Sequence, residues 1–368
     1  MGIQRERRLA LAAITVLLRR ARGGTLTERE LDGLNEVLAE QLVRTASAHG
    51  IASLMAAACE DPLVAQHLDP DLVVFLQVLR DSNRTRNAAL LVQLLGIAAS
   101  LHATGVPVVV LKGGAGLIAP IFPDPADRLM TDLDILVPEG LIDAALAALK
   151  ADGYGDDGQR YERSKKHAPA LRHTAQPAVL EVHTALSVRS GNRVLPADDM
   201  IARALPTACP GLLVASPADR LCHLVMHAQI DNEFYDVRLV VLRDMIEAEA
   251  LASHLTASDW IEVRRRFAAH DLQHMFDGFV ANAGDVAGRP IAPFEESREA
   301  RAWATATWQS LIEPDRHRRR YLWQVAQWYG ARVWADPSLA PRLFGAAVSP
   351  QKLRGLVTRT RAILKSYQ

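Results

Sequence analysis

The sequence predicts an α+β protein in which a small α/β core lies between mainly helical regions. Apolar residues recur at helical spacing through residues 5–103, short β-branched runs appear between 106 and 187, and helical periodicity returns near Ser216. The chain has 368 residues, of which 49% are hydrophobic, so two or three structural units with a sizeable core are expected. We divide the chain into a helical region 1–103, the core 104–190, a helical region 191–290 packing on the core, and a basic tail 291–368.

Three strands and two helices are predicted within the core. "VPVVVLKGG" (106–114) is typical of a buried strand that enters a glycine turn, with a helix from Ala115. "TDLDILV" (131–137) and "AVLEVHTALS" (178–187) are the second and third strands. The helix between them has Pro138 near its start and Gly153 after its end, the usual positions of these residues.

Composition and termini indicate a cytoplasmic protein. Cys59, Cys209 and Cys222 are widely spaced and show no disulfide framework, which favours a reducing compartment. The N-terminal apolar run resembles a signal peptide, but Arg19 and Arg20 follow it directly and no small-residue cleavage site is evident. The run is also shorter than the roughly 20 residues that span a bilayer, so we interpret it as a core-facing helix and predict no transmembrane segment.

Two aspartates in the second core strand carry the functional prediction. Side chains at positions i and i+2 of a strand share a face, so Asp132 and Asp134 point one way and Leu133 and Ile135 the other. In "LEVH", Glu181 and His183 likewise share a face. If the two strands are neighbours, three carboxylates converge and repel one another unless a cation neutralises them. Oxygen ligands without cysteine favour Mg²⁺ or Mn²⁺ bound together with substrate phosphates.

A single Asp-x-Asp pair on its own more often marks a half-exposed strand with a solvated face. The glycines of "KGG" strengthen the functional interpretation, because a glycine turn between a strand and a helix lets backbone N–H groups approach a phosphate. The turn is not a Walker A loop, since Lys112 precedes the glycines and no GK[ST] follows.

The stretch "VPVVVLKGGAGLIAPIFPDPADRLMTDLDILV" resembles the nucleotidyltransferase superfamily with the polymerase-β-like fold. More closely, the chain resembles a bacterial, uncharacterised nucleotidyltransferase family over residues 80–250. The motifs that carry this resemblance are Leu111-Lys112-Gly113, Arg128, Asp132-Leu133-Asp134, Gly153-Tyr154, Glu181-Val182-His183 and a helical segment that ends near Asp244. The resemblance implies a small mixed sheet, a divalent metal and nucleotidyl transfer, and it leaves the acceptor open.

The chemistry of such a transfer suggests roles for these residues. Asp132 and Asp134 would hold two metal ions, and Glu181 would hold the ion nearest the acceptor or take its proton. Gly113 and Gly114 would offer backbone N–H groups to the β- and γ-phosphates. Lys112 or Arg128 would neutralise the triphosphate, although a structural ion pair explains Arg128 equally well. His183 and Asp244 are possible additional site residues, and a lone His is more often structural.

Two further patterns admit a functional and a structural interpretation. His223 and His227 lie four residues apart on a predicted helix and could bind zinc, but no third ligand is evident and helix packing is the commoner explanation. Net charge is zero overall, yet the segment from residue 301 onward contains twelve basic residues and only three acidic ones. Trp303, Trp308, Trp323, Trp328 and Trp334 are interleaved with them. This tail either packs on the acidic body or binds RNA, an acidic protein or an anionic membrane.

The sequence therefore predicts a Mg²⁺-dependent nucleotidyltransferase that moves a nucleoside monophosphate from an NTP to a small molecule, a peptide or protein, or an RNA, with release of pyrophosphate. The alternative is a non-catalytic interaction module that keeps the fold and binds a protein or RNA partner. A kinase-like phosphotransferase lacks sequence support. Metal-dependent NTP binding separates the first two, and the released product separates the first from the third.

Overall fold

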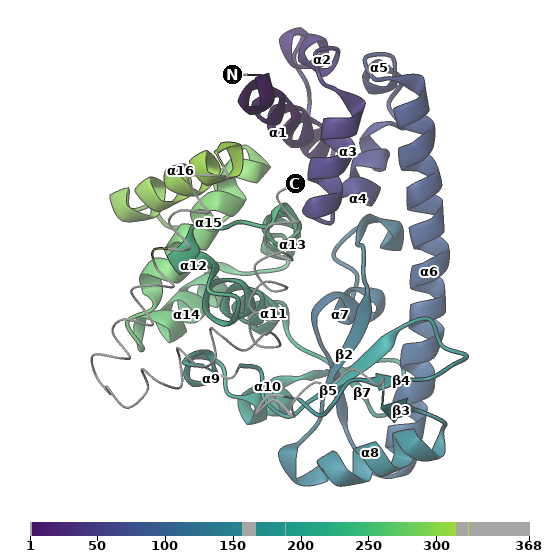
Figure 1. The fold of residues 1–368 in the computed structure, drawn as a ribbon. Helices are drawn as coiled ribbons and strands as arrows, with labels where there is room; N and C mark the ends of the chain where they lie inside the picture. The colour runs from purple at the N-terminus through teal and green to yellow at the C-terminus, as the bar shows by residue number, and fades with distance from the viewer. Residues whose placement is uncertain (1, 157–166, 188, 314–322, 324–368) are drawn as a thin grey trace, which may run out of the picture.

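A mixed seven-stranded sheet with helices packed around it forms the lower half of the molecule in Figure 1. The structure is a computed structural model that describes residues 2–156, 167–187, 189–313 and 323. Its helices, with the sheet among them, confirm the predicted α+β class.

The strands are β1 (Val108–Val110), β2 (Asp132–Leu136), β3 (Gly155–Asp156), β4 (Leu171–Arg172), β5 (Val179–His183), β6 (Leu205–Pro206) and β7 (Leu212–Val214). The helices before the sheet are α1 (Gly2–Ala21), α2 (Glu28–Leu34), α3 (Ala39–Ala48), α4 (Ala52–Ala58), α5 (Pro62–Ala65) and α6 (Pro70–Ala103). Those between the strands are α7 (Lys112–Ile118), η1 (Pro125–Asp127), η2 (Glu139–Leu141), α8 (Ile142–Ala151), α9 (Gly191–Val194) and α10 (Ala197–Arg203). After β7 come α11 (Pro217–Met226), the π-helical turn η3 (His227–Asp231), α12 (Phe234–Val237), α13 (Leu242–Ala252), α14 (Ala257–Ala268), α15 (Gln273–Ala287) and α16 (Arg298–Ile312).

The strand order is β3-β4-β5-β2-β1-β7-β6. The predicted second and third strands are direct neighbours, since β2 pairs in parallel with β5 and Asp134 lies opposite Glu181. β1 is antiparallel to β2 and parallel to β7. All three valines of β1 are buried, as expected for a strand with partners on both sides. The sheet extends beyond residue 190, because β6 and β7 come from residues 205–214.

The two faces of β2 serve different purposes. Leu133 and Ile135 are fully buried in a core shared with Leu180 and Val182 of β5, and this core is covered by α6 and α8. The opposite face carries the predicted acids and is turned toward the later helices. The alternation deduced from the sequence therefore places the acids on one face and the core on the other.

Helix α6 runs along the whole right side of the molecule in Figure 1 and joins its two halves. Near its C-terminal end, Leu90, Leu94, Ile97 and Leu101 follow helical spacing and pack on the sheet. Near its N-terminal end, Leu72 and Leu76 belong to the second core, formed with the N-terminal and later helices. The helix ends just before Gly105, which has a left-handed φ of 76°.

The described terminal helices, α1 and α16, both pack on the body of the protein. α1 buries Ile14, Leu17 and Leu18 in the second core, as expected for a core-facing helix. In α16, Trp303 stacks on Tyr235 with ring centroids 5.0 Å apart, and Trp308 donates to Asp285 Oδ2 at 3.0 Å.

Trp323 is exposed, whereas Trp328, Trp334 and most of the basic tail lie outside the described residues. Within the described part of the chain, no helix is both long enough and apolar enough to cross a bilayer.

A polar stripe on α6 holds the loop that leads into β2. Asn83 Nδ2 donates to the carbonyls of Ala126 and Arg128 at 2.7 and 3.1 Å. Asn87 Nδ2 donates to those of Pro125 and Arg128 at 2.6 and 2.8 Å. These asparagines are four residues apart and therefore lie on one face of α6. The stripe fixes the approach of Arg128 and of the first aspartate to the sheet.

We expect Asn87→Ala to lower the free energy of unfolding by about 1–3 kcal/mol, because it removes the Asn87 donor from the part-buried carbonyls of Pro125 and Arg128. Urea denaturation measures this change. Thr85→Ala on the same helix is the control, since Thr85 is exposed and its hydroxyl donates to Asp81 O of its own helix at 3.1 Å. Its effect should stay within about 0.5 kcal/mol. Equal effects of the two substitutions would contradict an anchoring role for the stripe.

Candidate active site

The site begins at Lys112, where β1 passes directly into α7. The helix starts at Lys112, three residues before the predicted Ala115, so both glycines lie in its first turn. Leu111 N–H donates to the carbonyl of Asp134 at 2.9 Å, which keeps the chain paired to β2 up to this point. Lys112 then adopts a left-handed backbone with φ of 48°, an unfavourable conformation for a residue with a Cβ. This turn directs the lysine side chain toward Asp134.

Asp134 is the most enclosed of the predicted acids, with 3% of its surface exposed. Its Oδ1 accepts from Lys112 Nζ at 2.5 Å and lies 2.8 Å from His183 Nε2. Burial acts to raise the pKa of Asp134, but Lys112 and His183 outweigh it and hold that pKa well below its usual range. Burial likewise acts to lower the pKa of Lys112, and Asp134 raises it above its ordinary value. Both groups are therefore charged at neutral pH.

Glu181 and Asp132 complete a group of three carboxylates. Glu181 Oε2 lies 3.3 Å from His183 Nε2, and this contact lowers the pKa of Glu181. Burial and the charge of Asp134 raise the pKa of Asp132. The charges of Asp134 and Glu181 thus both act on Asp132.

His183 occupies a more central place than expected from the sequence. One ligand atom from each of Asp134, Glu181 and His183 lies within 4.8 Å of the others. Among the described residues, no other cluster of three or more such side chains could hold a metal ion, and Asp132 lies outside this one. Within the described ranges, the buried His183 Nδ1 has no hydrogen-bond partner, whereas Nε2 contacts Asp134 and Glu181.

Gly113 and Gly114 are required by close packing. A Cβ on Gly113 would lie 2.7 Å from Met130 Cγ, and one on Gly114 would lie 2.9 Å from Val110 Cγ2. The glycines let α7 sit directly against β1 and the segment before β2. Packing therefore accounts for both glycines, and the backbone N–H groups of this first turn have no partners within the helix.

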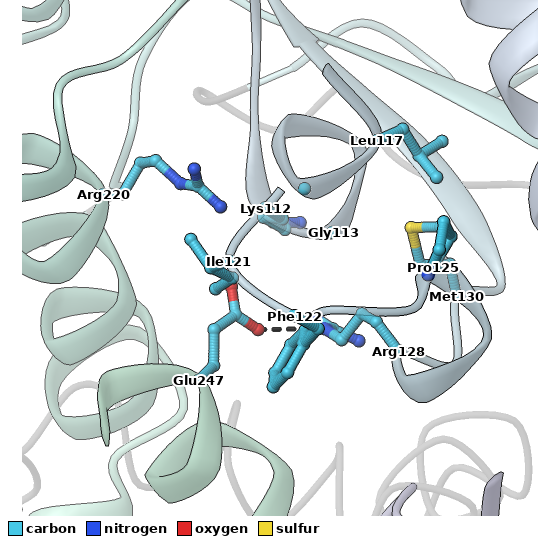
Figure 2. Close-up of a pocket in the computed structure, with 11 residues that line it drawn as sticks. Lys112, Gly113, Leu117, Ile121, Phe122, Pro125, Arg128, Met130, Arg220 and Glu247 are labelled. Atoms are coloured by element: carbon cyan, nitrogen blue, oxygen red, sulfur yellow. Dashed lines mark hydrogen bonds and ion pairs between the residues drawn. The ribbon is translucent and has the colours of Figure 1, made fainter. Parts of the chain in front are cut away.

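Arg128 and Asp244 lie on the wall of a pocket beside the acids. Arg128 Nε donates to Glu247 Oε2 at 2.9 Å, the structural ion pair that the sequence left open (Figure 2). Asp244 is 5% exposed and lies 3.4 Å from Arg243 Nε. Both residues face a cavity that Lys112 also lines.

Sequence reasoning missed Arg220, Arg243 and Glu247, which line the same pocket. The available signal was helical spacing: Arg220, His223 and His227 follow an i, i+3, i+7 pattern. His223 and His227 both line the pocket, with ring centroids 6.4 Å apart. They belong to no group of three or more possible metal ligands in the described part of the chain.

Comparisons with known proteins identify a family for this chain. A family model described as "Uncharacterised nucleotidyltransferase" matches residues 35–288, more than half of the chain. No curated protein matches the chain significantly. Among solved structures, the crystal structure of JHP933 from Helicobacter pylori is 13% identical and has a TM-score of 0.31. That match covers 65% of this chain and 98% of the other, and at this TM-score we draw nothing from it.

We expect Gly114→Ala to destabilise the protein by about 1–3 kcal/mol, because the added methyl group presses on Val110 in a buried strand. Gly96→Ala is a matched control in α6, where nothing lies within 4 Å of the new Cβ. It should stabilise by about 0.5–1 kcal/mol through its helix propensity. Chemical denaturation compares the two. If both stabilise alike, the packing argument for the glycine turn is wrong.

Proposed function

The chain belongs to a family of nucleotidyltransferases, and on this premise we propose that it transfers a nucleoside monophosphate from an NTP to an acceptor and releases pyrophosphate. The family predicted from the motifs is thereby confirmed. In the transfer, an acceptor oxygen bonds to the α-phosphorus, and the bond from that phosphorus to the α–β bridging oxygen breaks. The observation that carries the proposal is the pairing of Asp134 with Glu181 on adjacent parallel strands, with Lys112 held against Asp134.

The acids fit the Mg²⁺ or Mn²⁺ that this reaction needs. Asp132, Asp134 and Glu181 together with the ammonium of Lys112 leave two negative charges, which match one divalent cation. Ligand atoms of Asp134, Glu181 and His183 lie within 4.8 Å of one another, comparable to the roughly 4.2 Å between opposite ligands of an ion bound at about 2.1 Å. When bound, such ions stabilise the charge on the transferring phosphoryl group and on the leaving pyrophosphate.

The pair formed by Asp134 and Glu181 has two chemically different sides. Along β2, Asp132 precedes the pair, and along β5, His183 follows it. The Asp132 side offers oxygen ligands only, which suits Mg²⁺, whereas the His183 side adds an imidazole, which tolerates Mn²⁺ and other transition metals. His183 is therefore proposed as a ligand beside the predicted acids.

The remaining residues would bind and orient the substrates. Lys112 lines the pocket while it contacts Asp134, so its ammonium can face a phosphate from that position. Gly113 and Gly114 would offer backbone N–H groups to the phosphates. Glu181 would take the acceptor's proton, a role worth typically 10²–10⁴-fold in rate. Arg128, held by Glu247, would shape the pocket and contribute charge to it.

The interaction-module alternative has less support. A module without catalysis has no use for a buried carboxylate cluster, which is costly to maintain. The acceptor, an RNA or acidic partner for the basic tail, and a cytoplasmic location all stay predictions.

We expect a non-hydrolysable NTP to bind the wild type only with Mg²⁺ or Mn²⁺, and Asp132→Asn/Asp134→Asn to weaken that binding by more than about 100-fold. Even changes outside the ligand shell of a metal site cost about 10–100-fold. Calorimetric titration measures the affinity. Asp143→Asn, a change of the same kind at an exposed position of α8, should leave it unchanged. Turnover should release pyrophosphate, and release of NDP instead would indicate a phosphotransferase.

We expect both His183→Gln and His183→Ala to weaken Mn²⁺ binding more than Mg²⁺ binding, because each lacks the imidazole. Gln keeps a side-chain donor for Asp134, so it tests whether His183 only orients that carboxylate. Calorimetry with each metal, and electron paramagnetic resonance for Mn²⁺, give the readout. Wild-type Mn²⁺ affinity in His183→Gln would reduce His183 to a positioning residue.

A further inference from the structure

A second, basic region adjoins the acids. Two neighbouring cavities of about 20 and 60 Å³ share Lys112, Arg128, Arg220 and Glu247 in their walls. They lie between α7, the loop before β2, and helices α11 and α13 (Figure 2). The larger is wide enough for several water molecules, at roughly 10–15 Å³ each. Lys112 lines both cavities and contacts Asp134, so the cavities adjoin the proposed site.

Three of the four cations in the cavity walls have carboxylate partners. Lys112 contacts Asp134, Arg128 contacts Glu247, and Arg243 contacts its neighbour Asp244. Among the residues that the structure describes, no carboxylate lies at ion-pairing distance from Arg220. Its Nη1 donates to the carbonyl of Ala119 at 2.9 Å, and its buried Nη2 has no hydrogen-bond partner among those residues. One guanidinium therefore remains uncompensated.

This guanidinium points into the space between Lys112 and Glu247 in Figure 2. The charge of Glu247 does not balance it, because Arg128, Arg220 and Arg243 all act on that single carboxylate. Leaving a charge and a donor buried without partners is costly, because buried polar groups are normally hydrogen-bonded. The planar guanidinium of an arginine can donate two parallel N–H bonds to phosphate oxygens, which an ammonium group cannot do.

We propose that Arg220 binds a phosphoryl group in the pocket beside Lys112. The chemistry fits two sources: the terminal phosphates of the NTP, or a phosphate carried by the acceptor. The inference rests on the proposed function in naming these sources, but the binding of phosphate itself does not depend on catalysis. The competing role for Arg220 is structural, since the Ala119 carbonyl that it contacts belongs to the C-cap of α7.

The test compares wild type with Arg220→Gln, using inorganic phosphate, tripolyphosphate, an NMP and a non-hydrolysable NTP as probes in calorimetry. Arg220→Gln should weaken tripolyphosphate or phosphate binding by about 10–100-fold, as expected when a charged hydrogen bond is lost. Arg220→Lys keeps the positive charge but loses the paired N–H groups of the guanidinium. Its affinity should therefore lie between those of wild type and Arg220→Gln. Arg193→Gln removes a charge from an exposed arginine and should match wild type.

The probes separate the two sources. If the NTP supplies the phosphoryl group, Arg220→Gln weakens the NTP and tripolyphosphate but not the NMP. If the acceptor supplies it, NTP affinity stays at the wild-type value, and inorganic phosphate binding to the NTP-saturated protein is lost.

Wild-type affinity of Arg220→Gln for every probe would overturn the proposal, as would a wild type that binds no phosphate probe. If Arg220 has only a structural role, Arg220→Gln lowers the unfolding temperature of the ligand-free protein and leaves phosphate affinity unchanged. Arg220→Lys would then fail to restore the unfolding temperature. Failure of the proposed function has a different signature: phosphate binds through Arg220, yet NTP binding needs neither the metal nor Asp132 and Asp134.

Discussion

The ionised carboxylate of Asp134 is the constraint on which the site depends. It is buried in the centre of a sheet, where an unpaired charge is costly, so the fold must supply partners for it. Lys112 does so through a left-handed backbone conformation, and His183 through the next position along the face of the neighbouring strand. Both partners depend on strand pairing, because β1 delivers the lysine and β5 delivers the histidine. The geometry of the acids is therefore a property of three strands together.

The loop before β2 obeys a second constraint, imposed from the other side by α6. Carbonyl groups of this irregular segment would be left without partners if the loop were covered by apolar residues alone. Asn83 and Asn87 supply the missing donors, and Arg80 adds an ion pair to Asp127 at 3.0 Å. Helix α6 thus packs on the core through leucines near its C-terminal end. Nearer its N-terminal end, its polar residues hold the loop that leads to the site.

Sequence reasoning reached the strands and their polar face because these follow from local alternation. Asp132 and Asp134 share a face by backbone geometry alone, and neighbouring strands then bring Glu181 and His183 beside them. It missed β7, a three-residue strand about 100 positions after its partner β1, because so short an apolar run carries no distinctive period. It also missed Arg220 and Glu247, whose meeting depends on how α11 and α13 pack against each other. Spacing within one helix cannot predict contacts between helices.

The acids and the arginine pocket are two regions of opposite charge that meet at Lys112. The acids, with Lys112 counted among them, have an excess of negative charge, whereas the pocket has the unpaired guanidinium of Arg220. Neither region is balanced by the described residues around it. A divalent cation bound together with a phosphate-bearing substrate would supply both missing charges at once, positive at the carboxylates and negative at the arginine. Lys112 would then contact both charges, which explains why its strained left-handed backbone conformation is maintained.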